Sequence, residues 1–286
     1  MSEIIVEKLR HIYSAGTPFE VAAIEDIDLV IPQGQLVAVI GHTGSGKSTF
    51  IQHLNALLSP SSGKVSCGGK DINENKLSRK AVKSQVGLVF QYPEYQLFEE
   101  TVYKDIAFGP RNMKLPEEEV DQRVREAAGF TGVEEELLDK SPLELSGGQK
   151  RRVAIAGVIA MRPGVLILDE PTAGLDPAGC RQIMENICSY REKTGATVII
   201  VSHNMDDVAR IAERIIVFSH GRIVMDGSAR EVFSRAQELV EIGLDVPHAT
   251  ELAMELKKRG LPLPEGIYTH EQLLSSLLEL KGVASC

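Results

Sequence analysis

The sequence has no apolar run that is long enough to cross a bilayer, which takes about 20 consecutive apolar residues. Its longest run, residues 153–161, is about half that length and is followed by Arg162. The start of the chain, with Glu3, has neither a basic segment nor an apolar one after it, so we expect no secretory signal. These absences predict a chain that does not span a membrane, and they still allow it to be a peripheral subunit of a membrane complex.

Cysteine is scarce, and basic residues do not dominate. The four cysteines include no CxxC pair and no companion histidine at metal-ligand spacing, so we expect reduced thiols in a cytoplasmic protein. Forty acidic residues against 31 Lys and Arg give a net charge of −9. This balance disfavours nucleic acid as a partner, because phosphate backbones are bound by basic surfaces. The length of 286 residues predicts about two domains or one domain with appendages.

Short apolar runs alternate with amphipathic stretches, a pattern typical of an α/β fold with a mainly parallel sheet. The runs at 36–40, 165–168 and 197–201 are continuously apolar, as expected of buried parallel strands. Residues 215–218 and 222–225 flank a Ser-His-Gly turn and predict a β-hairpin.

Two regions differ from this alternation. Residues 92–160 lack strand signals and predict a helical subdomain within a larger domain of residues 1–240. Prolines at 247, 262 and 264 separate short helical stretches near the end of the chain. We therefore expect a small C-terminal extension over residues 241–286.

Residues 41–49 match the phosphate-loop pattern G-x-x-x-x-G-K-[ST], after the strand at 36–40 and before a helix expected at 49–58. Glycines let backbone N–H groups turn toward phosphate oxygens, and the helix adds its positive end. Lys47 supplies a charge to the β- and γ-phosphates, and the Ser48 hydroxyl is a ligand for Mg²⁺. We expect an ATP and Mg²⁺ site that comprises Gly41, His42, Thr43, Gly44, Ser45, Gly46, Lys47, Ser48 and Thr49.

The strand at 165–168 ends in Asp169-Glu170. A carboxylate at this position suits a contact of Asp169 with Mg²⁺, and Glu170 can polarise a water for in-line attack on the γ-phosphate. The alternative is a solvated acidic pair that closes a strand. A guanine-specifying N-K-x-D element is not evident, because the run that starts at Asn75 lacks the acid. A GTPase is therefore disfavoured.

A five-residue motif, Leu145-Ser146-Gly147-Gly148-Gln149, indicates the family. With it the sequence resembles the nucleotide-binding subunits of ATP-binding-cassette (ABC) transporters over about residues 1–235. The resemblance implies a P-loop ATPase core with an N-terminal antiparallel β region, the helical subdomain and a small helical extension. It also implies that Tyr13 stacks on adenine, that Gln91 contacts Mg²⁺ and the attacking water, that Asp176 lies in the D-loop and that His203 contacts the γ-phosphate.

In that family the signature acts in trans, on ATP held by the P-loop of a second subunit, so we expect an isolated monomer to hydrolyse ATP poorly. The residues also allow a local role, since Ser146 is a good N-cap for a helix expected from Gln149 onward. The two roles are compatible, because the free N–H groups of a capped helix end are what would bind a phosphate.

The segment from Gln91 to Phe98, and then from Thr101 to Pro110, is similar to that of energy-coupling factor (ECF) transporter ATPases, which import vitamins or transition-metal ions. This similarity implies a peripheral position on the cytoplasmic face of the membrane. It also implies a transmembrane coupling protein, a membrane substrate-binding subunit and a second ATPase as partners. The Phe-Gly-Pro-Arg-Asn run resembles the second ATPase of the heteromeric pair, and the C-terminal extension fits a contact between ATPases.

Glu94 lies among three aromatic residues and Leu97. We expect it to pair with an arginine on a helix of the membrane partner; the alternative is that these aromatics pack inside the helical subdomain. Two other functions remain open. One is the ATPase of a different ABC transporter with separate membrane subunits. The other is a soluble ABC ATPase of DNA repair or translation, which the single P-loop, single signature and missing heptad repeat disfavour.

Overall fold

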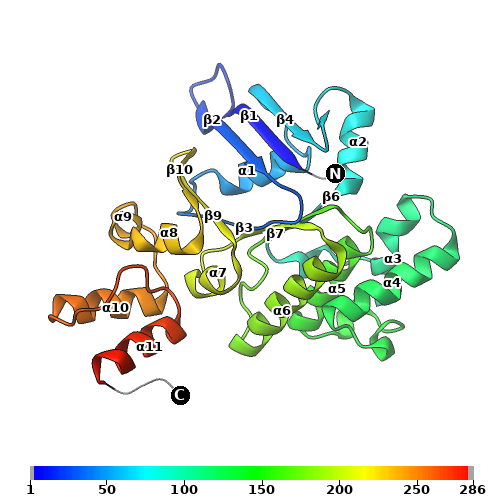
Figure 1. Ribbon diagram of the computed structural model, residues 1–286. Helices are drawn as coiled ribbons and strands as arrows, with labels where there is room; N and C mark the ends of the chain where they lie inside the picture. The colour runs from blue at the N-terminus through cyan, green and yellow to red at the C-terminus, as the bar shows by residue number, and fades with distance from the viewer. Residues whose placement is uncertain (1–2, 283–286) are drawn as a thin grey trace. The chain divides into compact units, whose positions relative to one another are not determined.

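The computed structural model describes residues 3–282 (Figure 1). The chain divides into two units. The first unit contains the chain up to Gln35 together with Ser48–Val201. The second contains Leu36–Lys47 and the chain from Ser202 onward. The last four residues of the expected C-terminal extension, 283–286, lie outside the described residues. Consecutive motif residues Lys47 and Ser48 thus belong to different units, and each unit is described by itself.

The first unit contains an antiparallel sheet with the strand order β2-β1-β4-β5. Its strands are β1 (Ile4–Tyr13), β2 (Val21–Ile31), β4 (Ser62–Cys67) and β5 (Lys70–Asp71). On β1 and β2, buried residues alternate with exposed ones over much of their length, so one face of this pair packs inward. This sheet is the N-terminal antiparallel region that the family resemblance implied.

Three parallel strands of the first unit are β6 (Val86–Val89), β7 (Val165–Asp169) and β8 (Thr197–Val201). Every residue of β7 and β8 is buried, as their continuous apolar runs predicted. In register, Val89 lies opposite Leu168, and Asp169 lies opposite Val201. The carboxyl ends of all three strands therefore meet at one edge, which is where open α/β sheets bind ligands.

Helices make up the rest of this unit. The first two helices are α1 (Lys47–Leu54) and α2 (Lys76–Gln85). Between β6 and β7, the described residues form helices and no strand. The helices α3, α4 and α5 pack against one another in this segment, and α6 follows β7 (Figure 1). Their bounds are η1 Pro93–Gln96, α3 Val102–Asn112, α4 Glu117–Thr131, η2 Glu135–Leu137, η3 Pro142–Glu144, α5 Gly147–Ile159 and α6 Pro177–Thr194.

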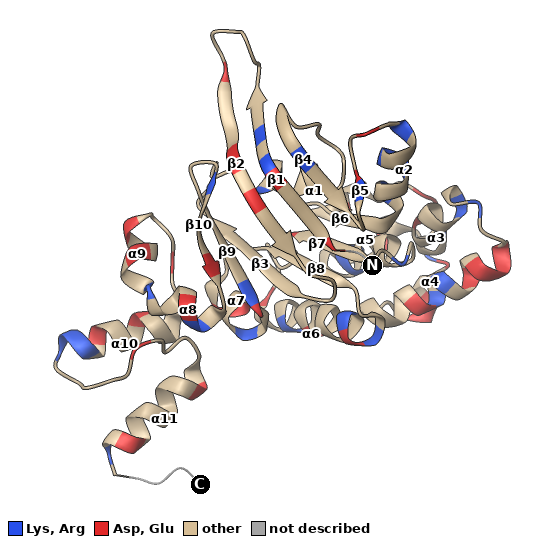
Figure 2. Ribbon diagram, turned by 45° about the horizontal axis from the view of Figure 1, so that its top comes forward, with Lys and Arg blue, Asp and Glu red and all other residues tan. Residues whose placement is uncertain are grey.

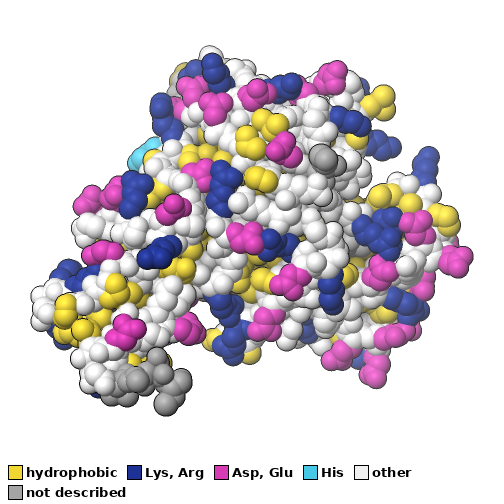
Figure 3. All heavy atoms as spheres, in the orientation of Figure 1, with side chains coloured by type: hydrophobic (Ala, Val, Ile, Leu, Met, Phe, Trp, Pro, Cys, Tyr) yellow, Lys and Arg dark blue, Asp and Glu magenta, His cyan; other side chains and the backbone are white. Residues whose placement is uncertain are grey.

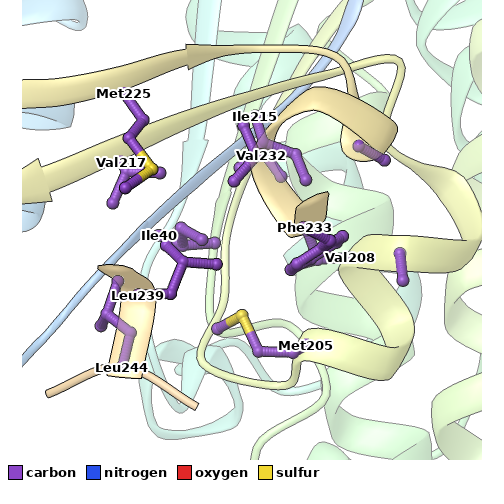
Figure 4. Packing of buried hydrophobic residues seen from close by; sticks show 13 residues of the cluster. Ile40, Met205, Val208, Ile215, Val217, Met225, Val232, Phe233, Leu239 and Leu244 are labelled. Carbon is purple, nitrogen blue, oxygen red and sulfur yellow. The ribbon is translucent and has the colours of Figure 1, made fainter. Parts of the chain in front are cut away.

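The second unit is built on β3 (Leu36–Gly41), which pairs in parallel with β9 (Arg214–Ser219). The next strand, β10 (Arg222–Gly227), pairs antiparallel with β9 and forms the predicted hairpin. Figure 4 shows the core on one side of these strands, where Ile40, Ile215 and Val217 meet Phe233 and Leu239. The helices that supply this core are α7 (Met205–Ile211), α8 (Ala229–Ser234) and α9 (Ala236–Glu241).

Two further helices, α10 (His248–Lys258) and α11 (His270–Leu280), belong to the expected C-terminal extension. They share a small core of their own, made of Ala249, Ala253, Leu263, Ile267 and Leu273. The hydroxyl of Thr250 donates to the carbonyl of Ile267 at 2.8 Å, which fixes the loop between the two helices. That residues 241–286 act as a separate domain stays a prediction.

Two helix boundaries differ from the expected ones. Helix α1 starts at Lys47 rather than Thr49 and ends at Leu54 rather than near residue 58. It ends early because Ala56 has a positive φ of 57°, which no α-helix continues. Helix α5 starts at Gly147, two residues before Gln149, because the cap is Ser146.

Candidate functional site

The phosphate-loop motif of the second unit forms a tight turn between the end of β3 and Lys47. Gly41 has a φ of +157°, and a Cβ there would lie 2.4 Å from the carbonyl oxygen of Phe218, so no other residue fits. Gly44 and Gly46 have φ values of 79° and 105°, in the region that favours glycine. The Gly221 N–H donates to the Ser45 carbonyl at 2.9 Å, which ties the loop to the β9–β10 turn.

Lys47 lies across the loop that precedes it. Its Nζ donates to the carbonyl oxygens of Gly41 at 2.6 Å and His42 at 3.0 Å. The ring of His42 lies 5.1 Å from that of His220, and its Nδ1 lies 2.9 Å from the Thr43 carbonyl oxygen. The ammonium group is thereby held against the backbone of the glycine loop by the carbonyls of Gly41 and His42.

The other half of the motif continues in the first unit with Ser48. Its Oγ donates to Oδ2 of Asp169 at 3.4 Å, across 121 residues of sequence. Asp169 is the last residue of β7 and is 8% exposed. A hydroxyl and a carboxylate oxygen at this distance are hard oxygen ligands of the kind that Mg²⁺ prefers. Two of the three residues that were expected to hold the metal, Ser48 and Asp169, are therefore brought together, and the role of Gln91 stays a prediction.

Glu170 follows directly and has a left-handed backbone with a φ of 50°. Its N–H donates to the Val201 carbonyl at 2.9 Å, so the end of β8 fixes the turn. Strained backbone of this kind is typical of functional positions. Gln91 is exposed two residues after β6 ends, at the same strand edge as Asp169. The expected group of Gln91, Asp169 and Glu170 thus shares one edge of the parallel strands.

His203 is exposed in the second unit, in the link between β8 and α7. Local hydrogen bonds fix its neighbours: the Asn204 N–H donates to the Ser202 Oγ at 3.0 Å, and the Asn204 side chain caps α7. Asp206, in the first turn of α7, in turn accepts a hydrogen bond of 3.0 Å from the His248 N–H at the start of α10. The segment around His203 is therefore held in a defined place.

Tyr13 lies at the end of β1 and is 40% exposed. Its hydroxyl is 3.2 Å from the Thr49 Oγ1, within hydrogen-bond reach. Thr49 is two residues after Lys47 in the chain. The aromatic residue expected beside the base is thus tied to the helix that starts at the phosphate loop.

The signature motif forms the start of α5. The Ser146 Oγ accepts from the Gln149 N–H at 3.3 Å, and the Gln149 Oε1 accepts from the Ser146 N–H at 2.9 Å, which is a complete capping box. The predicted cap is confirmed. The first residue of the motif, Leu145, is buried and anchors it, whereas Gly147 is exposed.

The signature motif and the start of α6 line one open pocket of about 550 Å³. Asp176 caps α6 by accepting from the Gly179 N–H at 2.7 Å, and both residues line this pocket with Ser146 and Gly148. The pocket is open to solvent and carries polar groups from two helix starts. It is a surface that can accept an anion from outside the chain.

Glu94 has an arginine partner within this chain, which we did not expect, and its pairing with an arginine of a membrane partner stays a prediction. Its Oε1 and Oε2 accept from Arg151 of α5 at 2.8 and 3.1 Å. The Arg151 side chain is 2% exposed and also donates to the carbonyls of Pro171 and Ala173. The expectation overlooked an internal pair because 57 residues separate the two side chains.

Arg151 is a buried charged residue beside the candidate site that sequence reasoning missed. It joins the segment after Gln91, the signature helix and the turn after Glu170 in a single buried network. Removal of one partner from such a pair costs about 3–5 kcal/mol, because the other charge stays buried. The available signal was the basic run Lys150-Arg151-Arg152 directly after the signature.

Two negative findings concern the described residues. Within residues 3–282, no helix combines the length and apolarity needed to cross a membrane. Over the same range, no three His, Cys, Asp or Glu side chains cluster as a metal site. On the face drawn in Figure 3, acidic and basic side chains are interspersed rather than gathered into a basic field.

A glycine loop that cradles a lysine, followed by a hydroxyl that faces an aspartate at a strand end, defines a P-loop nucleotide-binding protein. The ABC transporter family model matches residues 24–173. An ECF transporter ATP-binding protein EcfA2 of Caldanaerobacter subterraneus is 57% identical over 98% of both chains. An EcfA2 of Clostridium perfringens is 54% identical over 97% of this chain and 98% of the relative. The chain belongs to the ABC transporter family, among its ECF transporter ATP-binding proteins.

Solved structures agree. CbiO1 of Clostridium perfringens, described as part of the ABC transporter complex CbiONQ, is 41% identical with a TM-score of 0.75, over 88% of this chain and 98% of that one. A dimeric ATP-binding cassette in a post-hydrolysis state with ADP and Pi has a TM-score of 0.71 at 28% identity, over 79% and 98%. The predicted α/β P-loop ATPase fold is confirmed.

Proposed function

We propose that this chain is the ATP-binding and ATP-hydrolysing subunit of an ECF transporter. The observation that carries the proposal is the contact between Ser48 and Asp169 at 3.4 Å, directly after a glycine loop that surrounds Lys47. The names of the relatives support the transporter type, and nearly full-length similarity to them supports the same task for the whole chain.

Residues 41–49 would hold the triphosphate, with Tyr13 on the base and Lys47 on the β- and γ-phosphates. Bound Mg²⁺, with Ser48, Asp169 and Gln91 as the residues nearest to it, would neutralise phosphate charge. Glu170 would accept a proton from the attacking water, and His203 would contact the γ-phosphate. The strand edge common to Gln91, Asp169 and Glu170 supports these roles.

The partner in hydrolysis is a second ATPase. Leu145 is buried and anchors the signature turn. The turn itself is formed by Ser146, Gly147, Gly148 and Gln149, and Asp176 lines the same pocket. These residues would complete the ATP site of the other subunit, so one chain carries two half-sites. The similarity to proteins named EcfA2 favours a heteromeric pair, and residues 241–286 would supply further contact between the two ATPases.

The partner in the membrane is a coupling protein, which holds a substrate-binding subunit for a vitamin or a transition-metal ion. We place the contact at residues 92–98, where Tyr95 and Phe98 are 84% and 66% exposed. Glu94 contributes through the 15% of its side chain that Arg151 leaves accessible. Such an assembly puts this subunit on the cytoplasmic face of the membrane, with no nucleic acid as partner.

The test is a pull-down of the tagged chain from its native membranes in mild detergent. We expect a multi-span coupling protein, a related ATPase and a third membrane chain. Tyr95→Ala should reduce recovery of the membrane chains about tenfold and leave ATP binding unchanged, whereas Leu77→Ala, at a residue that is 80% exposed on α2, should change neither. Recovery of ribosomes or DNA-repair proteins, with no membrane protein, would contradict the proposed function.

A further inference from the structure

Three rings lie in a row in the first unit, and only one of them has a role in the proposed function. The ring of His11 packs edge-on against Tyr13, with centroids 4.4 Å apart, and against His53, with centroids 4.8 Å apart. His11 and Tyr13 belong to β1, and His53 belongs to α1. The row therefore joins the strand that carries Tyr13 to the helix that starts at the phosphate loop.

The two histidines are buried and poor in polar partners. His53 is 0% exposed and His11 is 8% exposed. Among residues 3–282, Nδ1 of His11 lacks a hydrogen-bond partner, and the His53 ring has the Leu58 backbone beside it. Burial, with His11 close by, lowers the pKa of His53 to about 4, although the nearby Leu58 backbone offsets part of this change. The His53 ring is therefore neutral at physiological pH.

Space-filling alone does not account for this arrangement. A leucine or phenylalanine would fill a similar volume without burying polar ring nitrogens, and buried polar groups with few partners are costly in a protein interior. The edge-on geometry instead uses the ring quadrupoles, which favour this orientation between aromatic neighbours. What the row fixes is the orientation of its exposed member, Tyr13.

Tyr13 is held at two points. Its hydroxyl is 3.2 Å from the Thr49 Oγ1, and its ring contacts the edge-on His11 ring. The hydroxyl contact alone leaves the ring free to turn about the line through its Cβ and oxygen. Contact with His11 removes that freedom, and the remainder of the ring, which belongs to a side chain 40% exposed, stays open to a flat ligand.

We propose that His11 is a positioning residue for nucleobase binding: supported by His53, it presets the Tyr13 ring for stacking. The inference rests on the proposed function, in which Tyr13 contacts adenine. It adds a specific consequence, since His11 acts on the base end of the nucleotide and not on the phosphate end.

The experiment compares dissociation constants for ATP and for inorganic tripolyphosphate, which lacks the base, on the full-length chain with Mg²⁺. In His11→Ala the Kd for ATP should rise about 3- to 10-fold, the size of one aromatic contact, while the Kd for tripolyphosphate stays constant. His11→Phe, which keeps a ring at the contact, should return the ATP Kd to within about twofold of the parent value. Arg10→Ala, at an exposed position next to His11 on β1, is the matched control and should change neither constant.

Two results would overturn the inference. One is an unchanged ATP Kd in His11→Ala; the other is an equal rise for both ligands, which indicates a general disturbance of the fold. Failure of the proposed function gives a different pattern. The parent chain then fails to bind ATP, or Tyr13→Ala leaves the ATP Kd unchanged, and the basis of the inference is lost with it.

Discussion

The helices α1, α4 and α5 begin in different ways, and the difference indicates which helix ends are open to an anion. The first turn of α4 carries Glu117, Glu118 and Glu119, which Figure 2 shows as the acidic start of this helix, whereas α1 and α5 have no acid there. The N-terminus of a helix is equivalent to about half a positive charge. The acidic side chains of α4 compensate the positive charge at its own N-terminus. Helices α1 and α5 have no such acids, so their N-termini stay available to an anion.

The lack of an acid is not sufficient by itself. Helix α2 also has none in its first turn, and its end is capped by the Asn75 side chain as that of α5 is capped by Ser146. What α1 and α5 add is glycine: Gly44 and Gly46 precede α1, and Gly147 and Gly148 open α5. A Cβ at Gly147 would meet no atom within 4 Å, so the approach to its backbone is open. Glycine together with an uncompensated helix end marks a phosphate-binding turn.

The starts of α1 and α5 also differ from each other. Helix α1 has its own cation, the Lys47 ammonium that bonds to the Gly41 carbonyl. Helix α5 has a capping box that uses up two groups of its first turn, and it has no such lysine at its first position. This asymmetry fits a main site at α1 and a contributing site at α5, which acts on a nucleotide that another subunit holds.

The largest effect is expected from an acid placed at the start of α5. Gln149→Glu keeps the size and the capping box, and adds a charge in the first turn. At about 7 Å from a phosphate, a unit charge costs about 2 kcal/mol with an effective dielectric constant of about 20, so ATP turnover of the dimer should fall about tenfold or more. Steady-state ATPase assays measure this loss.

The same substitution should not destabilise the fold. A first-turn acid adds about 0.3–1 kcal/mol to helix stability, so urea unfolding should show an unchanged or slightly higher free energy of unfolding. Turnover equal to that of the parent chain would mean that no phosphate approaches α5.

The smallest effect is expected from the converse swap at α4. Glu118→Gln removes an exposed acid from the first turn and should lower the free energy of unfolding by about 0.3–1 kcal/mol, with ATP turnover unchanged. Urea unfolding and ATPase assays on the same preparation measure both quantities. A clear change in turnover would instead show that the start of α4 takes part in the site.

Local patterns predicted much of this molecule, because the features concerned depend on neighbours in sequence. The continuous apolar runs gave β3, β7 and β8 to within a residue or so, and the Ser146 cap follows from its own residue type. The phosphate loop and Asp169 were also expected, and the structure brings Ser48 to Asp169.

What the patterns missed depends on contacts across the fold. The Glu94–Arg151 pair joins residues that are far apart in sequence, so no local pattern relates them. Glu94 was expected to pair with an arginine of a partner protein. The early end of α1 follows from a positive φ at Ala56, a residue type that usually continues a helix. The row of His11, Tyr13 and His53 arises only when β1 meets α1.

One chain is proposed to carry two half-sites, and ATP turnover as a function of protein concentration tests this most directly. Sedimentation at each concentration gives the fraction of dimer, for the chain alone and with the paired ATPase added. We predict that turnover per chain follows the dimer fraction and is at least about tenfold lower in the monomer. Full turnover at concentrations where only monomer is present would contradict it.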